Sequence, residues 1–450
     1  MQKRENRQER IAGQSDTLPS QQLYRAMRKY VVVNLSFLSI YLVALLYIVT
    51  NSSQRTVVAA AHDRKFETAA TGGSNQRECP CSDVRLCKPI ETIRILRNKK
   101  SSISFDLSNN IKHENKEVVG FTMATQLPSM AFEKLTTIIV FSETNADSIL
   151  CMAHSHGVRV IIKASAHLED FESAASIGKF VQNVTARTTH AFADGVNFDF
   201  EGALLDKNTA FNYSKLVQET TRSLKELNPY SQVSVDVPWS PDGIDNRYFD
   251  WLGLAQAADF LFVMAYDMRS QIWDQCIASA NSPLMQSEHG IQQYLELGIN
   301  EDQIVWGMPW YGYDYLCTTT NLSLNYCAIQ QIPFRGAPCS DAAGDERCLS
   351  NIISILSSTS VQKTQPELDP LLNSTSFFYF PSTNESRQMW YDDVESLSIK
   401  YMSAATMRLR GIGFWNIDCI EYNSKVESVR QHTYQMLKAI DVFTHYSERN

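Results

Sequence analysis

The sequence predicts an α/β protein built as a closed (β/α)8 TIM barrel, with a cysteine-containing insertion between the seventh and eighth strands. Eight short runs rich in Val, Ile and Phe follow residue 117, and amphipathic stretches such as 210–227 lie between several of them. Alternating strands and helices favour parallel pairing, and eight such units suit barrel closure. The last two runs are separated by roughly 95 residues, far more than one helix and its loops require. A doubly wound open sheet is the alternative.

The apolar runs give the expected strands, which are 117–123, 136–143, 158–165, 194–201, 232–240, 258–267, 303–315 and 411–418. The insertion is expected at about 316–395, a segment that holds four of the ten cysteines. Within it, 377–380 and 388–393 predict a hairpin, and 396–409 predicts the last helix before the final strand.

The N-terminal region predicts a protein of the secretory pathway. Basic residues dominate the first 29 positions, and the uncharged run 31–49 is long enough to cross a bilayer as a helix. The positive flank precedes this run, so the N-terminus is expected to stay cytosolic while the rest enters the lumen, as in a type II membrane protein. A cleaved signal peptide is the alternative, but the nearest small-residue cleavage pattern, at Ala59 and Ala61, lies well beyond the run.

Composition and these features together predict five parts. Hydrophobic residues make up 44% of the 450 positions, so a large core is available, and a net charge of −8 without a dense basic patch argues against a nucleic-acid partner. The expected parts are a cytosolic basic tail (1–29), a transmembrane signal anchor or signal peptide (30–50), a flexible stem (51–78), the barrel with its insertion (79–440) and a C-terminal tail (441–450).

The cysteines and sequons fit the same compartment. Ten cysteines are expected to form disulfides in an oxidising lumen. Zinc binding is the alternative for the cluster CPCSDVRLC at 79–87, which lacks the paired C-x-x-C spacing of common zinc sites. Sequons that suit a glycosylated luminal domain lie at Asn183, Asn212, Asn321, Asn373 and Asn384.

The run DGVNFDFEG, residues 194–202, carries the strongest chemical signal. Side chains alternate across a strand, so Asn197, Asp199 and Glu201 share one face. In a barrel that face points inward, with Glu201 at the C-terminal mouth where active sites form. Two carboxylates in a tight interior push their pKa values apart, and the raised member can act as a general acid. A half-exposed antiparallel strand with a solvated polar face is the alternative.

This run resembles the D-G-x-x-x-D-x-E signature of glycoside hydrolase family 18, the chitinase family. MAYD at 264–267 is similar to that family's motif in the sixth strand, and Trp415 stands where its final strand carries a sugar-stacking Trp. Longer runs, above all PFRGAPCSDAAG at 333–344, resemble the chitobiase branch of the family. The resemblance covers roughly residues 79–440.

The resemblance implies a retaining glycosidase in which the 2-acetamido carbonyl of the substrate attacks its own anomeric carbon. It implies that Glu201 protonates the leaving oxygen and later activates water, and that Asp199 orients the acetamide nitrogen. Tyr266 is expected to bond the acetamide oxygen, and Trp415 to form the floor of the sugar site. Asp194 is expected to fix the strand and to belong to the substrate-binding set.

Further residues are candidates for sugar contacts, and for several of them a structural role is the alternative. Asn197 replaces the Asp that is usual in the family, as the chitobiase branch also does; it can hydrogen-bond Asp199 but cannot ionise. Asp236 either touches substrate or fills the barrel. Trp239, Asp267 and Asp314 stand near aromatic strand ends, where loop capping is the alternative for the two acids.

His154 and His156 form an H-x-H pair before the third strand, for which a structural or solvated role is expected. A metal site is the alternative, but two such residues at a helix end do not converge on one ion. No metal and no cofactor is expected.

The function expected from the resemblance is hydrolysis of β-1,4-linked N-acetylglucosamine in chitooligosaccharides and in the chitobiose core of free N-glycan oligosaccharides. Cleavage is expected from the reducing end, by a monomer in the lysosome or another lumen of the secretory pathway. The rival is a catalytically weak chitinase-like lectin. Such proteins usually lose the acid, whereas Glu201 is present.

Overall fold

The computed structural model describes residues 77–91, 116–142, 147–268, 275–334 and 337–446. The predicted basic tail, the predicted membrane anchor and nearly all of the predicted stem lie outside these residues. Within the described ranges, no helix combines the length and the apolar character needed to span a bilayer.

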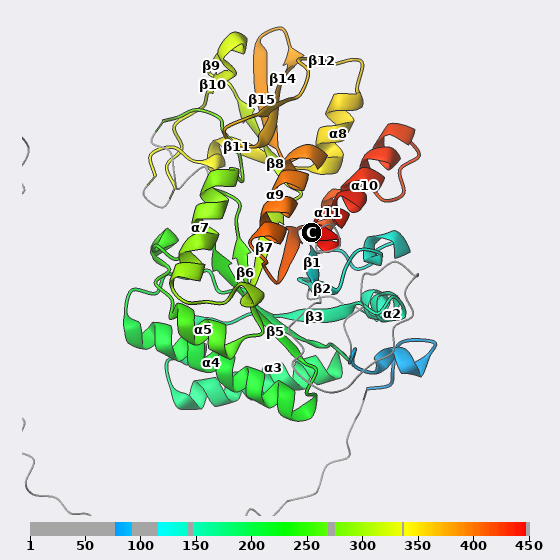
Figure 1. The fold of residues 1–450 in the computed structure, drawn as a ribbon, viewed down its shortest axis with the longest axis vertical. Helices are drawn as coiled ribbons and strands as arrows, with labels where there is room; N and C mark the ends of the chain where they lie inside the picture. Colours follow the sequence, from blue (N-terminus) through cyan, green and yellow to red (C-terminus); the bar gives the residue numbers. More distant parts are fainter. Residues whose placement is uncertain (1–76, 92–115, 143–146, 269–274, 335–336, 447–450) are drawn as a thin grey trace, which may run out of the picture. The chain divides into compact units, whose positions relative to one another are not determined.

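Eight parallel strands close into a barrel (Figure 1). Around the barrel the order is β1-β16-β7-β6-β5-β4-β3-β2, and closure is complete because β1 pairs with both β2 and β16. This confirms the predicted TIM barrel and excludes the open sheet. The strands are β1 (Glu117–Thr122), β2 (Thr137–Val140), β3 (Arg159–Ala164), β4 (Gly195–Phe198), β5 (Gln232–Pro238), β6 (Phe260–Met264), β7 (Ile304–Pro309) and β16 (Gly411–Trp415).

Amphipathic helices surround the barrel and bury one face against it. In α4 the buried residues Ala210, Tyr213, Val217 and Leu224 recur at helical spacing, and Asp206 caps the first turn. The helices of the barrel are α2 (Asp147–Ser155), α3 (Ala174–His190), α4 (Lys207–Leu227), α5 (Trp251–Ala257), α7 (Leu284–Glu296), α9 (Val394–Thr406), α10 (Glu427–Ala439) and α11 (Asp441–Thr444).

The seventh barrel strand is shorter than the sequence predicts. The run 303–315 was expected to be one strand, but β7 ends at Pro309 and β8 (Tyr311–Leu316) belongs to the insertion. Pro309 has no N–H to continue the ladder. The next residue, Trp310, still donates its backbone N–H to Trp415 O of β16 at 2.8 Å and stacks on Phe414. From Tyr311 onward the chain pairs with β11 and β15 of the insertion instead.

The insertion is an antiparallel sheet with one helix, and in Figure 1 its strands β14 and β15 and helix α8 lie at the top of the view. The strand order is β11-β8-β15-β14-β12, with β13 beside β14. The predicted hairpin is present as β14 and β15. The remaining elements are β9 (Thr319–Asn321), β10 (Tyr326–Ala328), β11 (Gly344–Cys348), α8 (Leu349–Ser357), β12 (Gln362–Lys363), β13 (Glu367–Asp369), β14 (Ser374–Ser382) and β15 (Glu385–Tyr391).

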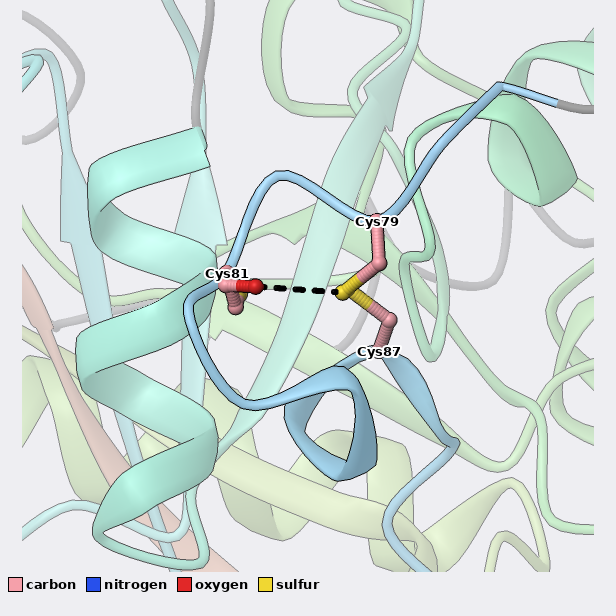
Figure 2. Close-up of side chains that lie close together, drawn as sticks. All are labelled: Cys79, Cys81 and Cys87. Carbon is pink, nitrogen blue, oxygen red and sulfur yellow. Dashed lines mark hydrogen bonds between the residues drawn. A yellow bond between two sulfur atoms is a disulfide. The ribbon is translucent and has the colours of Figure 1, made fainter.

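All ten cysteines form disulfides, as the sequence predicts. Figure 2 shows the N-terminal cluster, where the sulfurs of Cys79 and Cys87 are joined. The third member, Cys81, is bonded to Cys151 of α2. A zinc site needs free thiolates, so this pairing rules out the zinc alternative in the oxidised protein.

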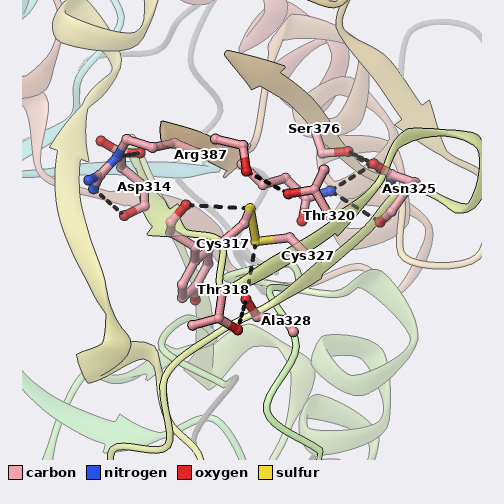
Figure 3. Close-up of a disulfide and its surroundings, with 12 residues drawn as sticks. Asp314, Cys317, Thr318, Thr320, Asn325, Cys327, Ala328, Ser376 and Arg387 are labelled. Atoms are coloured by element: carbon pink, nitrogen blue, oxygen red, sulfur yellow. Dashed lines mark hydrogen bonds and ion pairs between the residues drawn. A yellow bond between two sulfur atoms is a disulfide. The ribbon is translucent and has the colours of Figure 1, made fainter. Parts of the chain in front are cut away.

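Three more disulfides secure the insertion. Cys317–Cys327 lies inside it (Figure 3). Cys276–Cys339 joins the insertion to the loop after β6, and Cys348–Cys419 joins it to the segment after β16. The insertion is therefore covalently linked to the segments that follow β6 and β16, the two strands beside β7.

Candidate active site

Strand β4 turns its polar side chains into the barrel and its apolar side chains outward. Val196 and Phe198 are fully buried, and Phe198 lies 6.0 Å from Phe180 of α3 between ring centroids. The alternate residue Asn197 is fully buried inside the barrel. Asp199 and Glu201 follow the end of the strand and therefore stand at the C-terminal mouth. The half-exposed antiparallel alternative is thus wrong.

A cavity of about 540 Å³ opens at this mouth. Seven of the ten candidate residues line it: Asp199, Glu201, Asp236, Trp239, Tyr266, Asp267 and Trp415. Asp194, Asn197 and Asp314 are not among its lining residues. The insertion contributes to the wall through Tyr313, Phe334, Asp341, Ala342, Gly344 and Glu346.

Asp194 lies at the opposite end of β4 and is fully buried. Its side chain holds the strand in place and does not contact the substrate cavity. Its two oxygens accept the backbone N–H groups of Ile90 (2.8 Å) and Val160 (2.7 Å), and His154 Nε2 lies 2.8 Å from Oδ2. The expectation that Asp194 belongs to the substrate-binding set is therefore corrected. Asp194 shares the outward-facing side of the strand with Val196, so alternation already directs it away from the interior.

His154 and His156 bond separate partners. His154 reaches Asp194 and the carbonyl of Leu86 (2.6 Å), whereas His156 Nε2 lies 2.7 Å from Ser129 Oγ. The two rings therefore have structural contacts that do not converge on one point.

Asn197 is bonded to β5 rather than to Asp199. Its amide nitrogen donates to Asp236 Oδ1 at 2.8 Å and to Ser234 Oγ at 3.0 Å. Its carbonyl oxygen is buried and has no hydrogen-bond partner among the described residues. The contact with Asp199 that the sequence allows is not made in this structure.

Burial raises the pKa of Asp236 well above its ordinary value, and the nearby charge of Asp199 raises it further. The hydrogen bond from Asn197 and the charge of Lys163 act in the opposite direction. A carboxyl group in this setting retains its proton at a pH where an exposed aspartate has lost it. Asp236 therefore keeps its proton to a higher pH than an exposed aspartate does, next to the charge of Asp199.

Each of the two mouth carboxylates has its own cation. Lys163 Nζ of β3 lies 3.0 Å from Asp199 Oδ2. Arg247, whose side chain is almost fully buried, donates to Glu201 Oε2 at 2.6 Å and to Asp245 Oδ2 at 3.3 Å. Sequence reasoning missed both cations. Lys163 gave one signal, as a charged residue near the C-terminal end of an otherwise apolar run, whereas Arg247 lies in a loop without any local pattern.

Aromatic side chains form part of the lining of the cavity, among them Phe141, Tyr266 and Trp415. Trp415 packs on Phe121 and Phe141, with ring centroids 5.5 and 5.2 Å apart. Tyr266 lies 6.2 Å from Tyr311, and burial together with the charge of Asp236 raises the pKa of its hydroxyl. Tyr266 therefore stays a neutral hydrogen-bond donor, and Trp415 offers a ring face on which a sugar can stack.

Asp267 is held by two tyrosine hydroxyls. Tyr311 and Tyr313 donate to its Oδ1 at 2.6 and 3.0 Å, and its backbone N–H donates to Asn281 Oδ1. Burial raises the pKa of Asp267, and these two hydroxyls oppose that shift. Asp267 lines the cavity, so it stays a candidate for a sugar hydroxyl.

Asp314 has a structural role inside the insertion. It is fully buried and accepts from Arg387 Nε at 2.8 Å and from the Tyr379 hydroxyl at 2.7 Å. Figure 3 shows the contact with Arg387 close to the disulfide Cys317–Cys327. Asp314 does not line the cavity, so its possible contact with a sugar is not realised.

Comparison with known proteins identifies the family to which the chain belongs. The family model described as "Glycosyl hydrolases family 18" matches residues 108–419. The chain is 36% identical to the di-N-acetylchitobiase of Rattus norvegicus over 368 residues, which is 81% of this chain and 92% of that protein. It is 34% identical to the di-N-acetylchitobiase of Homo sapiens, covering 81% of this chain and 88% of the human protein.

Solved structures agree with the fold. A class V chitinase from Nicotiana tobaccum superposes with a TM-score of 0.58 at 12% identity, over 73% of this chain and all of that one. A chitinase from Rhizomucor miehei gives 0.57 at 21% identity, over the same shares. At these sequence identities, the structural similarity supports the barrel fold and nothing more specific.

Proposed function

This chain belongs to glycoside hydrolase family 18 and is a chitin-related glycosidase, and we propose that it cleaves the β-1,4 bond next to an N-acetylglucosamine with Glu201 as general acid. One observation carries the proposal. Asp199 and Glu201 after β4, Tyr266 after β6 and Trp415 at the end of β16 line the same cavity at the barrel mouth. Glu201 is the half-exposed member, so it can reach a bound glycosidic oxygen.

The mechanism we propose uses the substrate's own acetamide as the nucleophile. Asp199 and Glu201 follow one strand two residues apart, with Cα atoms about 7 Å apart along it. Both therefore approach the sugar from one side, and an attack from the opposite face must come from elsewhere. The acetamide carbonyl supplies it, Glu201 protonates the leaving oxygen, and Asp199 orients the acetamide nitrogen. Tyr266 donates to the acetamide oxygen, and Trp415 supports the ring.

The proposed substrates are chitooligosaccharides and the chitobiose core of free N-glycan oligosaccharides, cut from the reducing end. The names of the relatives favour a chitobiose-type substrate. The wall that the insertion adds, through Tyr313, Phe334 and Glu346, favours a cavity with one closed end. Digestion of chitotetraose with a free or a chemically reduced end tests this. Release of single residues from the free form alone is expected, and internal cuts or preference for the reduced form would refute it.

A fluorogenic chitobioside tests the enzyme proposal against the lectin alternative. Turnover by the purified protein is expected, with loss of turnover in Glu201→Gln. Binding of chitobiose by the wild type without any turnover would favour the lectin.

We propose that the barrel faces the lumen of the secretory pathway, in the lysosome or another compartment, as a glycosylated monomer behind an N-terminal anchor. Five disulfides are typical of proteins that mature in an oxidising lumen. Sequon residues Asn183, Asn321 and Asn384 are exposed and therefore accessible for glycosylation. Treatment with a peptide-N-glycosidase should increase the electrophoretic mobility. An unchanged mobility, together with extraction by carbonate, would argue against this topology.

A further inference from the structure

Lys163 is the charged side chain of strand β3 that reaches the active site. Its Nζ lies 3.0 Å from Asp199 Oδ2, and the two side chains are 31% and 12% exposed. Both groups are thus partly shielded from water, which strengthens their attraction compared with a fully exposed pair. Among the described residues, Lys163 is the one side chain that bonds Asp199.

The ammonium group of Lys163 also contacts an aromatic ring. It lies 4.4 Å from the ring centroid of Phe141, a cation–π distance. Phe141 in turn meets Trp415 edge to face, at 5.2 Å and 73°. A continuous set of contacts therefore runs from Trp415 through Phe141 and Lys163 to the carboxylate of Asp199.

The other neighbours of Asp199 do not provide this support. Asn197 uses its amide nitrogen on Ser234 and Asp236. Asp236 and Glu201 carry carboxyl groups, and the negative charge of Asp199 raises the pKa of Asp236. Without Lys163, Asp199 would stand among acidic groups with no cation in contact.

We propose that Lys163 is a positioning residue for hydrolysis. Through its ion pair it holds the carboxylate of Asp199 where the acetamide nitrogen of the substrate must bind, in place of a contact from position 197. This inference rests on the proposed function, because only a substrate with a 2-acetamido group has that nitrogen. An interaction made with the charge that develops on the acetamide acts mainly on kcat and little on KM.

Three variants test this on a fluorogenic chitobioside. Lys163→Met keeps the length and removes the charge, Lys163→Arg keeps the charge, and Lys225→Met is the matched control. Lys225 pairs with Asp259 at 2.6 Å and is 37% exposed, so its loss breaks a similar ion pair outside the cavity. We expect kcat of Lys163→Met to fall by about 10- to 100-fold with KM within about twofold. Lys163→Arg should regain most of the loss, and Lys225→Met should match the wild type.

A thiazoline analogue of the cyclic intermediate gives a second readout, because it binds Asp199 without any chemical step. Its affinity should fall in Lys163→Met and recover in Lys163→Arg. If Lys163→Met does not fold, the same measurements on Lys163→Gln replace it. Wild-type kcat and analogue affinity in a folded charge-free variant would overturn the role of Lys163. An inactive wild type would instead overturn the proposed function, so the two failures are distinguishable.

Discussion

The two ends of the barrel interior differ in how their charges are balanced. At the end where the strands begin, the buried carboxylate of Glu117 faces two guanidinium groups, Arg159 at 3.6 Å and Arg410 at 3.4 Å. It also accepts from Gln232 Nε2 at 3.0 Å and from Thr136 Oγ1 at 2.6 Å. Around Glu117, two cations therefore face one carboxylate.

The mouth has the opposite balance. Asp199 and Glu201 are each paired with one cation, whereas Asp236 is bonded, among the described residues, by the amide of Asn197 alone. Burial and the charge of Asp199 raise the pKa of Asp236. A carboxyl group that retains its proton beside two carboxylates is a feature of sites that transfer protons. One barrel therefore fixes its shape at one end and supports chemistry at the other.

Removing the acid at the mouth should have the largest effect. Glu201→Gln keeps the shape and the hydrogen bond from Arg247 but cannot donate a proton, so kcat on a chitobioside should fall by about 10² to 10⁴-fold. Thermal unfolding and binding of chitobiose should stay close to those of the wild type. A variant that keeps most of the wild-type rate would remove Glu201 from the mechanism.

Removing the carboxylate at the end where the strands begin should lower stability instead. Glu117→Gln leaves Arg159 and Arg410 without their carboxylate in a buried setting, which should lower the free energy of unfolding by about 3 kcal/mol or more. Urea denaturation measures the loss. The kcat of the folded fraction should be unchanged, and a large fall in kcat at full stability would contradict the division between the two ends.

Asp236 should act through the pH dependence of stability, with a smaller change per pH unit than the loss of Glu117 causes. Its pKa is raised in the folded state, so above the ordinary value of 3.8 the folded chain keeps a proton that the unfolded chain has lost. The stabilisation that this proton provides is complete below that value and is lost as the pH rises, by at most about 1.4 kcal/mol per pH unit. Asp236→Asn removes the titration, so the variant should gain stability relative to the wild type between pH 4 and pH 8. A constant difference in urea denaturation over that range would refute the assignment.

Local patterns were enough to predict the barrel and to place Asp199 and Glu201 at its mouth, because strand periodicity specifies both the elements and their inward faces. Tyr266 and Trp415 were predicted from the motif resemblance instead. Periodicity also directed Asp194 outward, and only the motif resemblance put it in the binding set. The end of β7 was misplaced because Pro309 interrupts a run that stays aromatic on both sides. Arg247 could not be predicted. Its contact with Glu201 depends on how two loops from neighbouring strands meet, with Leu204 N–H donating to Asn246 O at 3.0 Å.

The acetamide is the centre of the proposed mechanism, so substrates that differ only in this group test it most directly. Initial rates should be compared on an aryl chitobioside and on the matching aryl cellobioside, which has hydroxyls in place of the acetamides. Loss of the intramolecular nucleophile removes an effective molarity of roughly 10⁵ M or more, so hydrolysis of the cellobioside should fall close to background. NMR at early times should show the β anomer as the first product of the chitobioside. Comparable rates on the two substrates, or an α product, would contradict the account.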